Sequence, residues 1–138
     1  MDGHLEPPGI RHGRDAEADV ALDGGHRPGS HERRARDHQR IREATATSAP
    51  TRLWDGPFLQ MPNTKNMAGW AQARTYKHNG QVIDRQTHLG LDLASTAGAP
   101  VPAANAGTVA FAGDLGIYGR AVILDHGQGV FSLYGHLS

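Results

Sequence analysis

The stretch RQTHLGLDLAS, residues 85–95, carries two side chains that could bind a metal ion. His88 offers an imidazole nitrogen and Asp92 a carboxylate, and both groups bind zinc in proteins. Zinc holds each donor atom at about 2.0–2.2 Å, so two side chains must almost touch to share one ion. The stretch therefore predicts half of a metal site, provided that the backbone brings the two groups together.

The leucines of the same stretch favour a different structure. They alternate with other residues as in a half-buried strand: Leu89, Leu91 and Leu93. On a straight strand His88 and Asp92 would lie about 13 Å apart and would be polar residues of a solvent-facing edge. A helix would bring them together, but Gly90 and the alternation disfavour it. A bend or bulge at Gly90 is the remaining route, and from the residues alone both structures stay open.

The elements that must position these residues are predicted to be short strands. Three runs are rich in β-branched and aromatic residues and are separated by glycine-bearing turns: GTVAFAGD (107–114), RAVILDH (120–126) and GVFSLYGHL (129–137). Strands so close in sequence pair antiparallel, because a parallel crossover needs a dozen or more residues. The Asn79-Gly80 pair predicts another tight hairpin. No helix is predicted after residue 50, so the predicted fold is all-β, an antiparallel sheet or partial barrel.

Residues 1–50 have a different composition and contain no Phe, Trp or Tyr. A segment with so little to bury is predicted to be disordered, ahead of a folded domain over residues 51–138. Within it HERRARDHQRIREATA could form a helix with a favourable Glu32–Arg36 pair, but its polar character on all sides predicts a solvated or transient one. An arginine-rich nucleic-acid arm is the alternative, which the nearby acidic residues disfavour. Five irregularly spaced histidines predict no more than incidental metal affinity: His4, His12, His26, His31 and His38.

The composition of the whole chain excludes several function classes. Its 138 residues hold 14 Lys and Arg against 14 Asp and Glu, so no net charge attracts nucleic acid or an anionic membrane. The absence of cysteine excludes disulfides and thiolate metal sites. No apolar run approaches the roughly 18 residues of a membrane span, and the first residues do not have the pattern of a signal peptide.

The run from THLGLDLAS through GAPVPAANAGTVAFAG to YGRAVILDHGQGVFSLYGHLS resembles the lysostaphin/LytM-type zinc metallopeptidases, which are peptidoglycan endopeptidases. In that family His-x-Gly-x-Asp opens the zinc site, Pro-Val-x-Ala-x-x-x-Gly-x-Val follows, and a hairpin of the form viiDHG.G..tlYaHLs comes next. Residues 74–138 contain these pieces in the same order. Upstream, MAGWAQARTY is loosely similar to the family's strand ending in Phe-Gly-x-Arg, which would align Arg74 with that arginine.

The resemblance implies roles for three residues. His88 and Asp92 would be the first two ligands of Zn²⁺, and His136 would be the active-site histidine that does not bind metal. The implied reaction is hydrolysis of a peptidoglycan peptide bond by a metal-activated water, with His136 orienting the water, accepting its proton or stabilising the oxyanion. Three other residues of the run are predicted to be structural: His126, Tyr118 and Tyr134.

The family's pattern continues with a His-x-His motif that supplies the third ligand, and the sequence ends at Ser138 without it. Two protein ligands hold zinc poorly, since catalytic sites normally use three. We therefore expect the amino-terminal part of a metallopeptidase domain, inactive by itself. The resemblance also implies a place in the periplasm, cell envelope or outside the cell, with peptidoglycan peptide as the partner.

Two rival functions follow from the same motifs. Some relatives of the family lack metal ligands and activate cell-wall amidases without catalysis, and the presence of both His88 and Asp92 argues against that role. The piece PVPAANAGTV is also similar to lipoyl- or biotin-type carriers. Such a carrier needs a lysine at a hairpin tip, and no lysine follows Lys77, which excludes it.

Overall fold

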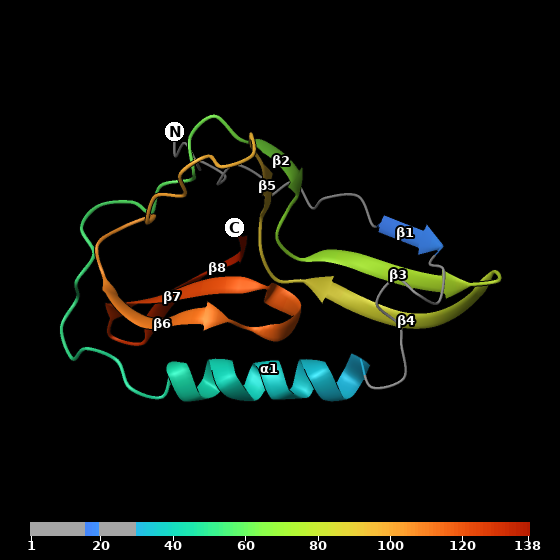
Figure 1. Ribbon diagram of the computed structural model, residues 1–138, viewed down its shortest axis with the longest axis horizontal. Helices are drawn as coiled ribbons and strands as arrows, with labels where there is room; N and C mark the ends of the chain where they lie inside the picture. The colour runs from blue at the N-terminus through green and yellow to red at the C-terminus, as the bar shows by residue number, and fades with distance from the viewer. Residues whose placement is uncertain (1–15, 20–29) are drawn as a thin grey trace, which may run out of the picture. The chain divides into compact units, whose positions relative to one another are not determined.

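The computed structural model describes residues 16–19 and 30–138, with side chains from Glu32 onward (Figure 1). The chain forms two compact units, each built from two separate segments. Of the described residues, the first contains 16–19 and 64–95, and the second contains 30–63 and 96–138. Four of the histidines noted above have side chains outside the described residues: His4, His12, His26 and His31.

The first unit is built around a hairpin of two antiparallel strands, β3 (Gln72–His78) and β4 (Gln81–His88). Asn79 and Gly80 form its two-residue turn with φ of 50° and 77°, the left-handed conformation that such turns require. The predicted hairpin is therefore confirmed. In its register Gln72 lies opposite His88.

Strand β1 (Ala16–Asp19) pairs with β3 in parallel, which differs from the antiparallel pairing expected throughout. It also lies inside the segment that was predicted to be disordered. Its sequence, AEAD, alternates alanine with acidic residues over only four positions and contains no β-branched or aromatic residue, so it carries little of the pattern that identifies strands. The pairing rests on backbone hydrogen bonding, which every residue except proline provides.

A second, two-stranded sheet of the same unit joins β2 (Lys65–Ala68) to β5 (Asp92–Ala94) in antiparallel fashion, with an irregularity at Met67. The chain thus leaves one sheet at His88 and enters another at Asp92. Figure 1 shows this change of direction between β4 and β5.

The second unit contains an antiparallel sheet of three strands in the order β6 (Thr108–Asp114), β7 (Arg120–Gly127) and β8 (Val130–Leu137). Each begins or ends within one residue of a run that the sequence predicted, and the all-β prediction is confirmed. The short helix η1 (Gly116–Tyr118) joins β6 to β7. The central strand β7 is the most apolar and most buried one, and its Ala121 and Ile123 form the core with Leu115.

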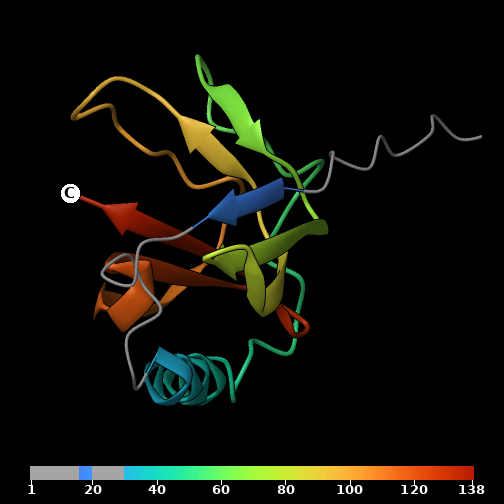
Figure 2. The same cartoon turned by 90° about the vertical axis from the view of Figure 1, so that its right-hand side faces the viewer.

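Helix α1 (Ser30–Ala44) lies along one face of this sheet, as Figures 1 and 2 both show. Ile41 and Ala44 pack against the core. The Asp37 side chain accepts a hydrogen bond from the Ile117 backbone N–H at 2.9 Å, and Asp37 is only 5% exposed. Arg40 donates to the Asp114 carbonyl oxygen at 2.7 Å.

The structure therefore differs from the expectation of disorder or of a solvated helix for residues 30–44. The physical reason is that α1 docks largely through polar side chains that bond to loop backbone. Hydrophobic periodicity treats such polar residues as solvent-facing, so it does not predict that this helix docks. No helix in the described part of the chain is both long and apolar enough to cross a bilayer.

The segment after α1 also contacts the sheet of the second unit. The Ala49 carbonyl oxygen accepts from the Gln128 N–H, and the Leu53 N–H donates to the His126 carbonyl oxygen, each at 2.8 Å. The Asp125 carboxylate accepts from the Ser48 hydroxyl at 2.7 Å. Backbone on both sides of residue 50 thus lies against β7, whereas the division of the whole chain into residues 1–50 and 51–138 stays a prediction.

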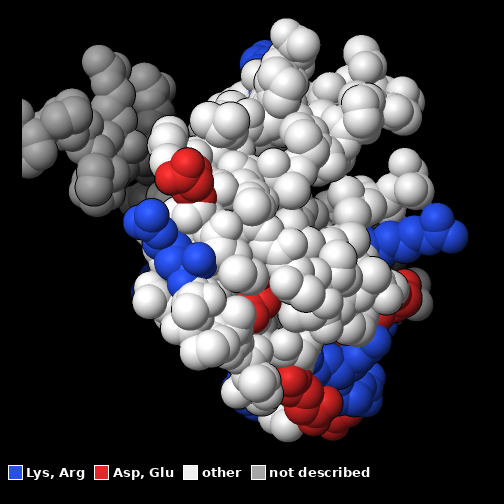
Figure 3. All heavy atoms as spheres, turned by 90° about the vertical axis from the view of Figure 1, so that its left-hand side faces the viewer, with Lys and Arg blue, Asp and Glu red and all other residues white. Residues whose placement is uncertain are grey.

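Charged side chains of both signs are interspersed on the face drawn in Figure 3, where blue and red atoms lie next to one another at the lower edge. This agrees with the balance of acidic and basic residues in the sequence. On this face, the described residues form no broad basic area of the kind that binds nucleic acid.

Candidate metal centre

The bend between β4 and β5 brings together the two residues that the sequence singled out. Strand β4 ends at His88, the chain bends at Gly90, and β5 begins at Asp92. The His88 Nε2 and Asp92 Oδ1 atoms lie 2.9 Å apart. A regular strand would separate these residues by about 13 Å, so the predicted convergence is confirmed.

The interpretation of this stretch as one continuous half-buried strand is wrong. Leu89 is 71% exposed and Leu91 is also exposed, since both lie in the connection between two sheets. Gly90 does not need a left-handed φ, and a Cβ there would lie 3.8 Å from His88 Nε2, an ordinary contact. The change of sheet therefore makes the bend, and glycine leaves open space beside the imidazole.

His88 is fixed by the turn that joins β2 to β3. Its Nδ1 lies 3.0 Å from the Gly69 carbonyl oxygen, and its own carbonyl oxygen accepts from the Ala71 N–H at 2.8 Å. A carbonyl oxygen only accepts hydrogen bonds, so Nδ1 carries the hydrogen. Nε2 is then the nitrogen that faces Asp92, either as a lone pair or as the second N–H of an imidazolium.

Asp92 divides its two oxygens between two partners. Oδ1 faces His88, and Oδ2 accepts a hydrogen bond from Arg74 Nη2 at 2.7 Å. Partial burial lowers the pKa of the Arg74 guanidinium, but its hydrogen bonds to Asp92 and Tyr76 outweigh that effect and raise the pKa above its usual value. Arg74 is therefore a permanent positive charge beside the carboxylate.

The His88–Asp92 pair fits one side of a zinc site. A neutral imidazole with its hydrogen on Nδ1 points a lone pair at a carboxylate oxygen, and two acceptors this close need a proton or a cation between them. Two tetrahedral ligands of zinc are about 3.3 Å apart, which these atoms reach by a shift of a few tenths of an ångström. Among the described residues, no group of three His, Cys, Asp or Glu side chains is placed to hold a metal ion.

His136, the third predicted site residue, belongs to the second unit and lies in an irregular part of β8. The register shifts where Arg120 pairs with Leu137 and Val122 with Tyr134, so Gly135 and His136 together face one residue of β7. His136 is exposed and has a φ of 56°, a left-handed conformation that is unusual for a residue with a side chain. Such bulges redirect a side chain and occur often at functional sites.

His126 is a structural residue, as the sequence analysis predicted. It is completely buried, with Nδ1 2.6 Å from the Ala106 carbonyl oxygen and Nε2 2.8 Å from the Ser132 hydroxyl. The Phe58 ring packs edge-to-face against it at 4.8 Å. Both ring nitrogens are thus occupied inside the core, which leaves no nitrogen for a ligand.

The two tyrosines also agree with the packing role expected for them. Tyr118 packs against the core formed by Leu115, Ala121 and Ile123, and burial raises the pKa of its hydroxyl. The Tyr134 hydroxyl accepts from the Ala104 N–H at 2.8 Å and is hydrogen-bonded to Ser132.

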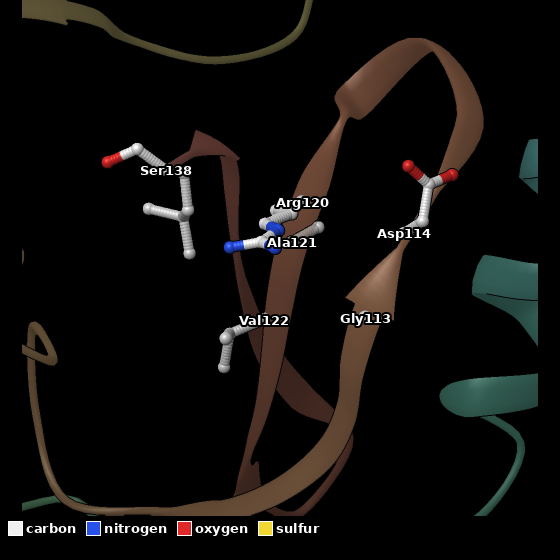
Figure 4. A pocket seen from close by; sticks show the side chains of 7 residues that line it. Gly113, Asp114, Arg120, Ala121, Val122 and Ser138 are labelled. Atoms are coloured by element: carbon white, nitrogen blue, oxygen red, sulfur yellow. The ribbon is translucent and has the colours of Figure 1, made fainter.

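A hollow of about 320 Å³ lies at one end of the β6–β7–β8 sheet (Figure 4). Asp114, Arg120 and Ser138 contribute its polar side chains, and the rest of the lining is apolar or glycine. None of His88, Asp92 and His136 lines it. The hollow is therefore a separate feature from the candidate metal centre.

The sequence analysis missed one group at the centre and gave too little weight to another. The missed group is the Gly69 carbonyl, which no motif marks because it is backbone. The underrated one is Arg74, whose alignment with the family's arginine was loose. The Asn79-Gly80 turn by itself gave no signal for Arg74, because the hairpin register shifts between Tyr76 and Lys77, and only that shift places Arg74 and His88 on the same face of adjacent strands.

Comparisons with known proteins relate part of this chain to a family of peptidases. Residues 86–138 match the model of peptidase family M23. Over 51 residues the chain is 47% identical to DD-carboxypeptidase/endopeptidase Mpg of Neisseria meningitidis serogroup B and to that of Neisseria gonorrhoeae. Each match covers 37% of this chain and 12% of the relative. Over 76 residues it is 38% identical to the lipoprotein NlpD/LppB homolog of Pseudomonas aeruginosa, which covers 51% of this chain and 24% of that relative.

The chain thus spans no more than a quarter of the length of these relatives. The matched segment nevertheless contains the His88–Asp92 pair and the histidine of the β8 bulge. Residues 86–138 are therefore similar to peptidase family M23, in agreement with the resemblance of the sequence motifs to LytM-type peptidases.

Proposed function

We propose that this chain contributes to a zinc-dependent endopeptidase domain that hydrolyses peptide bonds of bacterial peptidoglycan. The observation that supports the proposal most directly is the 2.9 Å approach of His88 Nε2 to Asp92 Oδ1 inside the segment that matches a peptidase family. The relatives named as carboxypeptidase and endopeptidase make peptide hydrolysis the expected chemistry. A relative named as a lipoprotein makes the cell envelope the expected location.

Different residues of the chain would have different roles in such a reaction. His88 and Asp92 would hold the zinc ion, which when bound supplies Lewis acidity that polarises a carbonyl and acidifies water. The Gly69 carbonyl keeps the hydrogen on His88 Nδ1, so that Nε2 presents its lone pair. Two such protein ligands leave the remaining coordination positions to other groups, including a third protein ligand.

His136 is proposed to act on the reacting atoms without binding metal. An imidazole ring carries one nitrogen that can accept a proton and one N–H that can donate, so this side chain can take a proton from water or donate a hydrogen bond to an oxyanion. The left-handed backbone of the bulge costs about 1 kcal/mol or more, and a role in catalysis is a reason for keeping it.

The test combines zinc binding with hydrolysis. We expect purified protein to bind zinc, and His88→Ala and Asp92→Ala to weaken that binding at least tenfold, measured by calorimetry. His136→Ala should leave zinc binding unchanged. In a protein that also supplies the third ligand, it should lower hydrolysis of purified peptidoglycan, followed by the appearance of new amino groups, by 100-fold or more. His38→Ala, in α1, is the matched control. Equal zinc binding by all variants would contradict the proposal.

The rival function, a peptidase-like domain that activates amidases without catalysis, makes the opposite prediction for zinc. In that case the natural protein would not bind zinc tightly, and substitutions at His88 and Asp92 would leave amidase stimulation unchanged.

A further inference from the structure

Arg74 reaches the candidate metal centre from a different strand than either of the proposed ligands. It lies in β3, whereas His88 ends β4 and Asp92 begins β5. Its Nη2 donates to Asp92 Oδ2 at 2.7 Å, and it is the only arginine for which the described residues show an ion pair with this carboxylate. Arg74 lies outside the segment that matches the peptidase family.

The register of the hairpin explains why Arg74 can make this contact. Gln72 lies opposite His88, and Arg74 lies opposite Gln86. Side chains two residues apart on a strand point to the same face, so Arg74 and His88 are diagonal neighbours on one face of the hairpin. Because the chain then bends at Gly90, Asp92 returns to the same face and comes within reach of both side chains.

Asp92 needs such a partner to keep a single orientation. Its side chain is 49% exposed and stands on a three-residue strand, whereas the His88 side chain is 15% exposed and is held by Gly69. An exposed carboxylate rotates among several positions, and in most of them its oxygens do not face the imidazole. With Oδ2 held by Arg74, the rotation stops at the orientation in which Oδ1 faces Nε2.

We propose that Arg74 is a positioning residue that fixes Asp92 as a one-oxygen ligand of the cation shared with His88. The inference rests on the proposed function, because it assumes that a cation binds to this pair. Outer partners of this kind orient the ligands of a metal, and their loss typically lowers metal affinity 10- to 100-fold. Arg74 acts through Asp92 and does not touch the metal.

An opposing effect makes the proposal easy to test. The guanidinium is a positive charge near the cation, and electrostatic repulsion alone would weaken metal binding. If Arg74 only repels the cation or competes for Asp92, its removal strengthens metal binding. If it positions Asp92, its removal weakens metal binding. The direction of the change therefore separates the two explanations.

The experiment measures Zn²⁺ affinity by calorimetry and the visible absorption of bound Co²⁺ in the whole chain. We expect Arg74→Ala to lower the affinity 10- to 100-fold and to change the Co²⁺ spectrum, because the released carboxylate is free to bind through both oxygens. Arg74→Lys, which keeps a charged donor, should recover part of the affinity. Arg85→Ala removes an exposed arginine of the neighbouring strand and should change neither measurement.

Affinity that is unchanged or higher in Arg74→Ala, together with an unchanged spectrum, would overturn the inference and leave the proposed function intact, provided that His88→Ala and Asp92→Ala still abolish binding. Absence of metal binding in the natural chain would overturn both. Circular dichroism of each variant verifies that the hairpin is retained, and a second substitution, Arg74→Gln, repeats the test with a neutral donor if the alanine variant is unfolded.

Discussion

His88 and His126 show how different surroundings make one histidine a candidate metal ligand and the other a part of the core. Both rings place Nδ1 against a backbone carbonyl oxygen, of Gly69 and Ala106 respectively. They differ at Nε2, which faces the Asp92 carboxylate in one case and the Ser132 hydroxyl in the other. A hydroxyl can donate to the Nε2 lone pair, whereas a carboxylate can only accept, so only the first pair calls for an added proton or cation.

The surroundings of the two rings reinforce that difference. His126 is completely buried beside Phe58, and its hydroxyl partner is joined in turn to Tyr134. Asp92 is half exposed and lies beside the permanent charge of Arg74. A buried neutral chain of hydrogen bonds stabilises a fold, and an exposed charged cluster is accessible to an ion and to a substrate.

The largest expected effect is on stability at the buried ring. His126→Ala should lower the free energy of unfolding by about 3–5 kcal/mol, because it opens a cavity and leaves the Ala106 carbonyl and the Ser132 hydroxyl without their partner. His88→Ala should cost only about 1–2 kcal/mol, since it loses hydrogen bonds at a partly exposed position. Urea denaturation measures both, and equal losses would show that the two histidines have the same structural role.

The two glycines beside these rings should show the same contrast in stability. Replacement by alanine should destabilise the protein more beside His126 than beside His88, and by less than the loss of the His126 ring itself. A Cβ at Gly107 would lie 2.7 Å from the Asp125 carbonyl oxygen and 2.8 Å from His126 Nδ1, so Gly107→Ala should destabilise the protein by about 2–3 kcal/mol. A Cβ at Gly90 would meet only an ordinary contact with His88. Gly90→Ala should therefore stay within about 1 kcal/mol of the natural protein in thermal unfolding, and a larger loss there would show that the bend depends on glycine.

The smallest expected effect is a pH dependence of the protein's stability that comes from Asp125. The pKa of this carboxyl is lowered first by the Ser48 hydroxyl and further by the backbone N–H groups of Ala49 and Gly127, against an opposing effect of burial. A lowered pKa in the folded state stabilises the protein above the unfolded pKa of about 3.9, and this contribution disappears as the pH falls through the folded pKa.

Urea midpoints measured from pH 6 down to pH 2 should therefore fall below about pH 4. The fall should be shallower in Asp125→Asn, and Asp55→Asn is a control for an exposed carboxylate. If both variants follow the natural protein over the whole range, Asp125 does not link the segment after α1 to the sheet in the way that the structure indicates.

Much of the fold was predictable because it follows from local patterns. The strands β6, β7 and β8 are apolar runs separated by glycine turns, and the Asn79-Gly80 pair specifies the β3–β4 turn through its left-handed backbone. The convergence of His88 and Asp92 was predicted only with the help of the resemblance to the metallopeptidase family, because the residues alone also allowed a straight strand. His136 was identified by its motif, and its role stays a proposal.

The docking of α1 was not predictable in this way. Besides the packing of Ile41 and Ala44, its contact with the sheet depends on two polar residues. Asp37 bonds to the backbone of η1, and Arg40 bonds to the carbonyl oxygen at the end of β6. From the sequence, such residues are indistinguishable from solvent-exposed ones, because their partners are 74–80 positions away. A Cβ at Gly116 would collide with the Asp37 carboxylate, so the fit depends on both segments at once.

The sequence by itself determined which residue types can be ligands and where the strands β6, β7 and β8 and the β3–β4 turn lie, since residue type and short-range spacing encode these features. Only the tertiary structure decided which groups surround the ligands. The Arg74 guanidinium and the Gly69 carbonyl reach the His88–Asp92 pair from 18 and 19 positions away, through a strand register and a turn. Hydrogen bonds over such separations exist only after the chain has folded, and they set the orientation on which the proposed metal binding would depend.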